Sequence, residues 1–212
     1  MAIFQAFRAL RPVPDKAEAV AALPYDVVTR EEAKEIGDQN PDSFLHVDRA
    51  EMDLPADTDL YDQKVYDRAR ENLINMEKNG ILVQDGAPCY YIYELTRKGK
   101  TQTGLVGCCS IDDYMNGVVK KHELTREDKE QDRIHHVDVC DANTGPIYLA
   151  CKYPQELLDL METWKASHDA IYDFVAEDEI GHRVWVIDGE AEKKVIAEQF
   201  GNIPYIYIAD GH

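Results

Sequence analysis

The stretch from residue 81 to residue 110 restricts the fold most, because it holds three strand-like segments in close succession. Apolar, β-branched and aromatic side chains, which favour strands, fill Ile81–Val83 and most of Cys89–Leu95, and Gln102–Ser110 continues the strand-like composition with Thr103, Leu105 and Val106. The turn between the second and third segments is Arg97-Lys98-Gly99-Lys100, whose glycine suits a β-hairpin. The stretch therefore predicts a sheet that contains an antiparallel hairpin.

Helices are predicted where apolar residues recur at helical spacing or where a cap is present. The longest helix is expected from about Leu60 to Lys78, with an apolar core-facing stripe and an end at Asn79-Gly80. Thr29 and Glu32 form a capping box that opens a helix to about Asp38. Shorter helices are expected over Asp15–Ala22, over Gln155–Lys165, and from a cap at Asp188 through Gln199.

The remaining segments predict further strands and turns. Strands are expected at Ile3–Phe7, Ile147–Cys151, Ala170–Ala176, His182–Ile187 and Ile203–Ile208. Turns are expected at Asp112–Gly117 and at Pro41–Val47, the latter leading into a strand, while the acidic segment Asp48–Asp59 is either a linker or a surface loop. Together these elements predict one α+β unit over residues 1–212, with a mixed sheet and several short helices.

Charge limits the partners of this chain. It carries 41 acidic and 23 basic side chains, a formal net charge of −18. This charge repels a phosphate backbone, so no nucleic-acid partner is expected. A local cluster of Lys and Arg can still bind a small anion, because distant charges are screened over about 10 Å. No apolar run approaches the roughly 20 residues of a membrane helix, and a signal-peptide pattern is missing, so we expect a cytoplasmic protein without a membrane partner.

The five cysteines do not follow a metal or disulfide pattern. Their number is odd and no C-x-x-C spacing occurs, which is typical of reduced, mostly buried thiols. Cys140 with His135 and His136 offers three zinc ligands in principle, but this spacing is not a recognised signature. Ordinary packing is the favoured interpretation, and no metal site is predicted.

Residues 120–133 form the first candidate site. The sequence Lys-Lys-His-Glu-Leu-Thr-Arg-Glu-Asp-Lys-Glu-Gln-Asp-Arg reads as the end of a strand followed by a charged helix. Thr125 and Asp128 approximate a capping box, which predicts the helix start. His122 and Glu123 then lie on the strand-to-helix turn, where free amides favour a phosphate or carboxylate. A plain solvated turn is the alternative.

Two arrangements follow this helix. Asp141–Pro146 stops it, and Ile147–Cys151 reads as a buried strand. Either strand, helix and strand form a crossover unit, with the Lys120 and Asn143-Thr144 turns at opposite ends of one layer. Alternatively, the helix kinks near Ile134 and both turns face one cleft.

Leu23–Val28 is the second candidate. Pro24 favours an extended Leu23, and Tyr25 and Asp26 follow on the connection to the next helix. Exposed Tyr-Asp pairs on loops can contact substrates, whereas the bland interpretation is that Tyr25 packs and Asp26 caps or faces water.

Several spaced motifs together resemble a bacterial and archaeal family known as domain of unknown function 1015. The motifs are Leu23–Val28, His122-Glu123-x-Thr125, Lys129-x-x-Asp132-Arg133, Ala142-Asn143-x-x-Pro146-Ile147-Tyr148-Leu149 and Ala209-Asp210-Gly211-His212. They cover essentially the whole chain. The last motif of the family usually continues as Asp-Gly-His-His-Arg, whereas this sequence stops at His212. We therefore expect the N-terminal portion of a longer protein.

That family in turn resembles the ParB and sulfiredoxin-like fold group, which includes nucleotide-dependent enzymes and kinases of free serine. The resemblance implies a ParB/sulfiredoxin-like element near the C-terminus and a phosphate-binding role for the last motif. Phosphoryl transfer needs hydrogen-bond donors around the phosphates, a divalent metal and a carboxylate beside the acceptor hydroxyl. The expected catalytic residues are Glu123, His122 and Asp210, and the expected ligand- or phosphate-binding residues are Tyr25, Asp26, Thr125, Lys129, Asp132, Arg133, Asn143 and His212.

Two functions remain open at this point. The first is a small-molecule phosphoryl-transfer enzyme, such as a kinase of free serine, that uses ATP or ADP with Mg²⁺. The second is a regulatory module that binds a nucleotide or amino acid without chemistry. Neither a Walker sequence nor a protein-kinase signature is present. The two differ experimentally, because only the first predicts that Glu123→Gln abolishes turnover while the fold stays intact.

Overall fold

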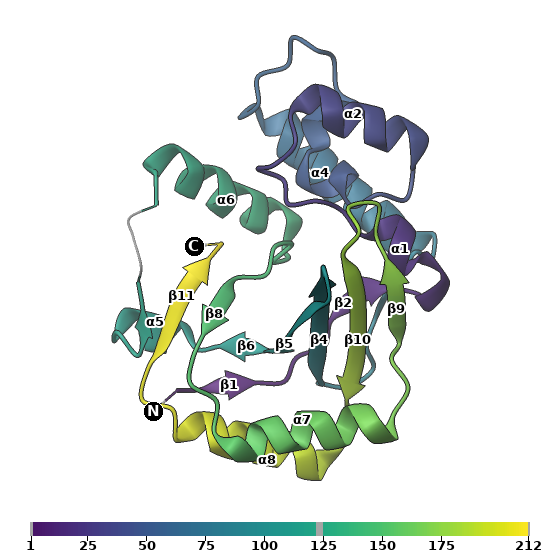
Figure 1. Ribbon diagram of the computed structural model, residues 1–212. Coiled ribbons are helices and arrows are strands. Elements are labelled where there is room, and N and C mark those ends of the chain that lie inside the picture. The colour runs from purple at the N-terminus through teal and green to yellow at the C-terminus, as the bar shows by residue number, and fades with distance from the viewer. Residues whose placement is uncertain (1, 122–124, 212) are drawn as a thin grey trace. The chain divides into compact units, whose positions relative to one another are not determined.

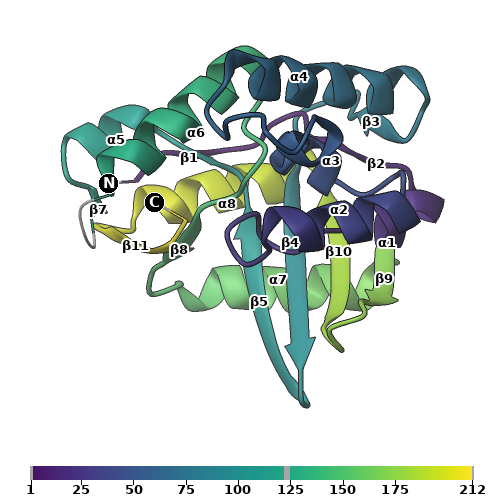
Figure 2. The same ribbon diagram turned by 90° about the horizontal axis from the view of Figure 1, so that it is seen from above.

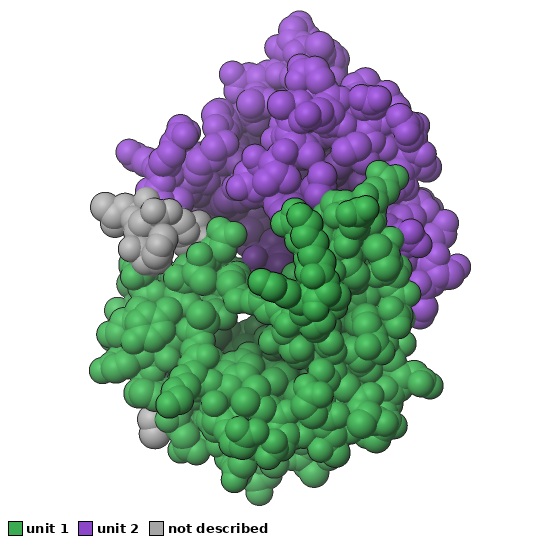
Figure 3. Space-filling model, in the orientation of Figure 1, with its two compact units in different colours: residues 1–10, 84–124, 147–212 green, residues 11–83, 125–146 purple. Residues whose placement is uncertain are grey.

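The computed structural model describes residues 2–121 and 125–211 of the chain (Figure 1). Its residues divide into two compact units (Figure 3). Unit 1 comprises residues 1–10, 84–124 and 147–212, and unit 2 comprises residues 11–83 and 125–146. The acidic segment 48–59, suggested as a linker, lies inside unit 2. The expectation of one unit over residues 1–212 stays a prediction, because two compact units can still unfold as one.

Unit 1 contains most of the strands. Its elements are β1 (Phe4–Gln5), β4 (Tyr90–Arg97), β5 (Lys100–Val106), β6 (Cys108–Cys109), α5 (Ile111–Met115), β7 (Val119–Lys120), β8 (Tyr148–Ala150), α7 (Gln155–Ser167), β9 (Tyr172–Val175), β10 (Gly181–Ile187), α8 (Glu190–Gly201) and β11 (Ile206–Asp210). β2 (Leu10–Pro12) and β3 (Leu82–Gln84) pair with each other. The boundary between the two units falls within each of these strands.

The main sheet of unit 1 is antiparallel, with strand order β5-β4-β10-β9. The predicted hairpin is confirmed, since β4 pairs with β5 through a turn in which Lys98 and Gly99 both have positive φ. The predicted pairing of residues 170–176 with 182–187 is confirmed by β9 and β10. Figure 2 shows α7 crossing beneath this sheet. Alternate residues of β4 and β10, among them Ile92 and Trp185, pack with side chains of α7 and α8 to form the core.

A second sheet of unit 1 is mixed, with order β7-β11-β8. β11 is parallel to β7 and antiparallel to β8, so β7 and β8 run in opposite directions. The predicted crossover unit is therefore wrong, because a crossover joins parallel strands. α6 (Glu127–Cys140) runs through Ile134 without a break, and the alternative, a kink there with both turns facing one cleft, stays a prediction. β8 is formed as predicted but is not buried, because Tyr148 is exposed.

Unit 2 consists mainly of helices. Its elements are η1 (Pro14–Lys16), α1 (Ala17–Val20), α2 (Arg30–Gln39), α3 (Leu45–Asp48), η2 (Ala50–Asp53), α4 (Gln63–Lys78) and α6, where η marks a 3₁₀ helix. The capping box of α2 is confirmed, with Thr29 and Glu32 bonded reciprocally. The long helix is confirmed as α4, whose apolar stripe is buried. α4 lies against α3, η2 and α6.

Three local predictions are wrong, each where a short helix replaces a loop or strand. Residues 45–48 form α3 instead of a strand, and Leu45 and Val47 are buried in it. Part of the acidic loop is η2, because Ala50 and Met52 enter the core of unit 2. The turn at residues 112–117 contains α5, capped by Ser110. Burial of scattered apolar residues favours these turns of helix, and composition alone does not show it.

The helix boundary at residue 188 is also corrected, since Gly189 is the N-cap residue of α8. The five cysteines form no disulfides, as predicted, but only Cys89 and Cys140 are buried. Among the residues that the structure describes, no helix is long and apolar enough to cross a membrane. The chain is α+β with several short helices and sheets of mixed type, as predicted. The ParB/sulfiredoxin-like element near the C-terminus stays a prediction.

Candidate functional site

The start of α6 differs from the prediction. Arg126, in an extended conformation, is the N-cap residue, so the predicted cap at Thr125 is wrong. The Asp128 carboxylate accepts bonds of 3.1 and 2.7 Å from the Arg126 guanidinium instead. Glu127, Asp128 and Glu130 make the first turn acidic. This helix start therefore repels an anion through its side chains, which opposes the attraction of its free amides.

The middle of α6 brings several polar side chains of unit 2 together. The cluster is formed where α6 packs along α4 and where the loop before α2 and the end of α3 approach it. We call it the α6 cluster, and it consists of Tyr25, Asp48, Tyr66, Asp132, Arg133, His136 and Thr144.

Asp132 is the anchor of this cluster. It is buried on α6, and its Oδ1 accepts a hydrogen bond of 2.9 Å from the Tyr66 hydroxyl. Its Oδ2 accepts bonds from Nε and Nη2 of Arg133, at 3.2 and 3.0 Å. Burial, followed by the bond to Asp132, raises the pKa of Tyr66, so its hydroxyl stays protonated and donates. Asp132 thereby fixes Arg133 from the helix side.

Tyr25 fixes the other side of the same guanidinium. The Arg133 Cζ lies 4.3 Å from the centroid of the Tyr25 ring, in cation–π geometry. The Tyr25 carbonyl accepts a bond of 2.8 Å from Arg49, which also pairs with Glu51 and so holds the loop in place. About 31% of the Arg133 side chain remains exposed, so a ligand can reach it. The arrangement is a preorganised cation.

Asp48 and His136 complete the cluster with unusual protonation behaviour. Burial raises the pKa of Asp48, against the opposing effects of a bond from Thr144 and the nearby charge of Arg133. Burial lowers the pKa of His136, although its bond to the carbonyl of Val47 acts in the other direction. His136 is only 3% exposed and is neutral at pH 7.

The neutral tautomer of His136 follows from its contacts. Its Nε2 lies 3.1 Å from the Val47 carbonyl oxygen, which can only accept, so Nε2 carries the proton. Nδ1 is then a buried acceptor without a hydrogen-bond partner among the described residues. Burying such an atom unpaired costs about 1–3 kcal/mol. A donor, either a ligand group or a water, would remove this cost.

The zinc alternative is wrong for the residues proposed. His135 stacks on Tyr66, with ring centroids 5.2 Å apart, whereas His136 faces Val47. Burial raises the pKa of the Cys140 thiol to about 11, so it stays protonated and is a poor ligand. Within residues 2–121 and 125–211, no three His, Cys, Asp or Glu side chains are grouped to hold a metal ion.

The predicted site residues are distributed unevenly. The α6 cluster brings together Tyr25, Asp132 and Arg133. Asp26 is exposed beside Tyr25, Asn143 is exposed beside Thr144, and Thr125 and Lys129 lie at the start of α6. Asp210 belongs to unit 1, where its Oδ1 accepts a bond of 2.9 Å from the Gly211 amide. His122, Glu123 and His212 lie outside the described residues, so their roles stay predictions.

Sequence reasoning missed the contributions of Asp48, Tyr66 and His136. Tyr66 is adjacent to Val65 in α4, and both are buried, so the sequence pattern indicates only a core residue at this position. The sequence places Asp48 in an acidic loop, since a charged residue among other acids gives no sign of burial. Only the i, i+4 spacing from Asp132 to His136 on one helix face was a usable signal.

The fold and this cluster define an α+β protein with a partly buried, charged site on a helical unit. The family model described as "Protein of unknown function (DUF1015)" matches residues 4–212, so the chain belongs to this family. Comparisons with curated proteins and with solved structures gave no match.

Proposed function

We propose that this protein transfers a phosphoryl group from a nucleotide, ATP or ADP, to the hydroxyl of a small molecule such as free serine. The observation that carries the proposal is the Arg133 guanidinium, which Asp132 and Tyr25 hold in place beside the carboxyl group of Asp48. Phosphoryl transfer requires a fixed cation near a carboxyl group, because catalysis of this reaction consists mostly of positioning the reactants and neutralising charge.

Arg133 is suited to bind phosphate oxygens. Its guanidinium is planar and always charged, and Asp132 and Tyr25 have already restricted its orientation. Binding a phosphate therefore costs little side-chain entropy. The formal charge of −18 on the whole chain does not oppose this, since the nearest charges decide the local potential.

Asp48 is suited to act as the general base. A carboxylate with a raised pKa accepts a proton more readily than an ordinary one, and burial supplies that shift here. Asp48 joins Glu123, Asp26 and Asp210 as a candidate for this role. Mg²⁺ would arrive with the nucleotide and would be held mainly by its phosphate oxygens and water.

A product assay tests this proposal. The protein is incubated with ATP or ADP, serine and Mg²⁺, and phosphoserine is measured by mass spectrometry. Arg133→Lys should lower kcat/KM at least tenfold, because lysine keeps the charge but cannot stack and bond in the same way. Asp48→Asn should lower kcat at least a hundredfold. The matched control is Arg126→Lys on the same helix, whose guanidinium is 75% exposed and pairs with Asp128 alone in the described residues.

Equal activity in the wild type and in the Arg133 and Asp48 variants would place the chemistry elsewhere. The alternative function is a module that binds a nucleotide or amino acid without chemistry. It is favoured by the fact that Asp132 is already engaged on both oxygens, as in a purely structural network. Saturable binding without any phosphoserine would support this alternative.

We also propose that the protein acts in the cytoplasm, where nucleotides and free amino acids are available, and that it has no nucleic-acid partner. The charge of −18 supports the second point. A gel-shift titration with duplex DNA at low salt, where electrostatic binding is strongest, provides the check.

A further inference from the structure

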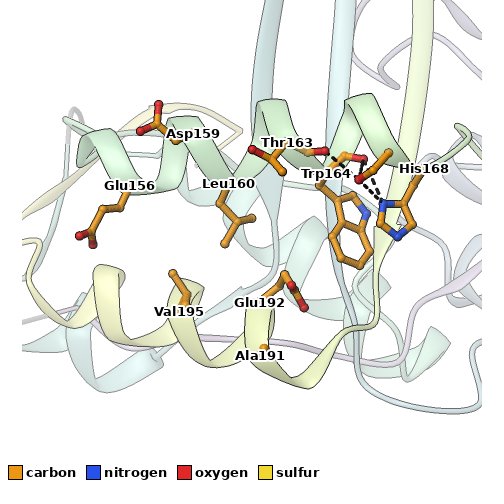
Figure 4. Close-up of a pocket in the computed structure, with 10 residues that line it drawn as sticks. Glu156, Asp159, Leu160, Thr163, Trp164, His168, Ala191, Glu192 and Val195 are labelled. Atoms are coloured by element: carbon orange, nitrogen blue, oxygen red, sulfur yellow. Dashed lines mark hydrogen bonds between the residues drawn. The ribbon is translucent and has the colours of Figure 1, made fainter.

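A groove of about 440 Å³ lies between α7 and α8 of unit 1 (Figure 4). The α7 side is contributed by residues spaced three or four apart, from Glu156 through Leu160 and Trp164 to His168, which places them on one helix face. The α8 side is contributed by Ala191, Glu192 and Val195. From residue 156 to residue 168 the groove follows α7 for about 18 Å, or about three helical turns.

The floor of the groove is apolar and firmly held. Leu160 and Val195 point into it from opposite helices (Figure 4). Trp164 is almost fully buried, and its indole N–H donates a bond of 3.0 Å to the carbonyl of Val186. His168 stacks on the indole at 3.7 Å between ring centroids, and its Nδ1 lies 3.1 Å from the Trp164 carbonyl oxygen. This rigid floor needs no rearrangement to receive an apolar side chain.

The ends of the groove are acidic. Glu156 lies near one end and Glu192 near the other, while Asp159 projects from the outer side of α7 (Figure 4). Among the residues that line the groove, all of them described by the structure, no lysine or arginine occurs. The nearby cations are engaged elsewhere, since Lys165 pairs with Glu94 and Glu162, and Lys193 pairs with Glu190. The groove therefore offers apolar contact framed by negative charge.

We propose that this groove docks a basic amphipathic helix of a partner protein. Helix-in-groove recognition lays an apolar helix face, with contacts at i, i+3, i+4 and i+7, into a groove with an apolar floor. Lysine or arginine residues beside that face would meet Glu156 and Glu192. A second copy of this chain is a poor occupant, because two molecules of charge −18 repel each other. An open channel of three turns is also longer than a small amine needs.

The test uses a fluorescent 14-residue helical peptide with leucines at i, i+3, i+4 and i+7 and lysines beside them. Fluorescence anisotropy should show saturable 1:1 binding to the full chain. A peptide with glutamate in place of every lysine should bind at least tenfold more weakly. Absence of saturable binding by the lysine peptide would overturn the proposal.

Matched variants separate this groove from general attraction to an acidic protein. Val195→Lys fills the groove and should raise Kd at least tenfold. Ala197→Lys makes the same charge change at an exposed position of α8 outside the groove, and should change Kd less than twofold. If both variants weaken binding equally, the peptide binds through general charge and the proposal is wrong.

A second pair of variants avoids any effect of Val195→Lys on folding. The double variant Glu156→Gln/Glu192→Gln should raise Kd at least fivefold and reduce its salt dependence. The control Glu177→Gln/Glu179→Gln removes the same charge from the turn between β9 and β10, and should leave Kd within twofold. Equal effects of the two double variants would overturn helix docking.

Discussion

Asp53→Asn should destabilise the protein more at pH 5.5 than at pH 8.5, because Asp53 is the partner of His46. The Nδ1 of His46 lies 3.0 and 2.9 Å from the two carboxylate oxygens of Asp53. The Asn72 amide donates to the same carboxylate at 2.8 Å and to the backbone carbonyl of His46 at 2.6 Å. The three residues lie on α3, η2 and α4, so their hydrogen bonds connect three helical segments of unit 2.

The direction of the pH effect follows from the two pKa shifts. The bond to Asp53 raises the pKa of His46 above 6.5 in the folded state. Burial alone would raise the pKa of Asp53, but the bond from His46 and its charge lower it below 3.8. The stabilisation by protonated His46 is thus full below pH 6.5 and is lost as the pH rises through the folded pKa. The contribution of Asp53 is present above pH 3.8 and is lost only in acid.

The expected magnitude is modest because the pair is partly exposed to water. The side chains of His46 and Asp53 are 19% and 24% exposed. A hydrogen bond to a charged group contributes about 1.5–3 kcal/mol, whereas a neutral one contributes about 0.5–1.5 kcal/mol. Asp53→Asn should therefore cost about 1 kcal/mol more at pH 5.5 than at pH 8.5. In a chain of this size, 1 kcal/mol corresponds to about 2–4 °C in Tm.

The assay is urea unfolding followed by circular dichroism at both pH values, for the wild type, Asp53→Asn, His46→Gln and the double variant. The coupling energy between the two sites should be larger at pH 5.5. Lys34→Ala is the control, because its pair with Asp38 is exposed on both sides and should contribute less than about 1 kcal/mol. A coupling energy that is the same at both pH values would refute a charged pair.

Three further predictions concern one position each. Tyr66→Phe leaves one oxygen of buried Asp132 unpaired and should cost about 1.5–3 kcal/mol in urea unfolding, whereas Tyr61→Phe, at an exposed site, should change stability by less than about 0.5 kcal/mol. Ile196→Ala opens a cavity in the core of unit 1 and should cost about 2–5 kcal/mol by the same measurement; a loss below 1 kcal/mol would contradict the core assignment. Glu123→Gln should abolish phosphoserine formation with an unchanged circular dichroism spectrum, and retained turnover would remove Glu123 from the mechanism.

Much of the fold could be predicted because its signals are local. Glycine at the β4–β5 turn, the Thr29 capping box and the stripe of α4 each act within a few residues, and each is confirmed. The short helices α3 and η2 were missed, since burial in the core of unit 2 stabilises them and their own sequence does not show it. The direction of β8 depends on its pairing with β11, about 60 residues later in the chain.

The candidate site could be predicted only in part for the same reason. Arg133 and Tyr25 were named from motifs, but their contact joins segments about 100 residues apart. Asp48 is a candidate base because burial raises its pKa, and this burial arises only when unit 2 is packed. The predicted anion site at the start of α6 depended on free amides, while the acidic side chains around them act in the opposite direction.

The most direct test of the central claim, that the α6 cluster binds a nucleotide, is thermal unfolding with and without ATP, ADP, serine and phosphoserine in the presence of Mg²⁺. A ligand at about 100 times its Kd stabilises by about 2.7 kcal/mol, which here corresponds to a rise of about 5–11 °C in Tm. We expect a nucleotide-dependent rise in the wild type and in Arg126→Lys, and little or none in Arg133→Ala. No rise with any nucleotide, or an equal rise in Arg133→Ala, would contradict the claim.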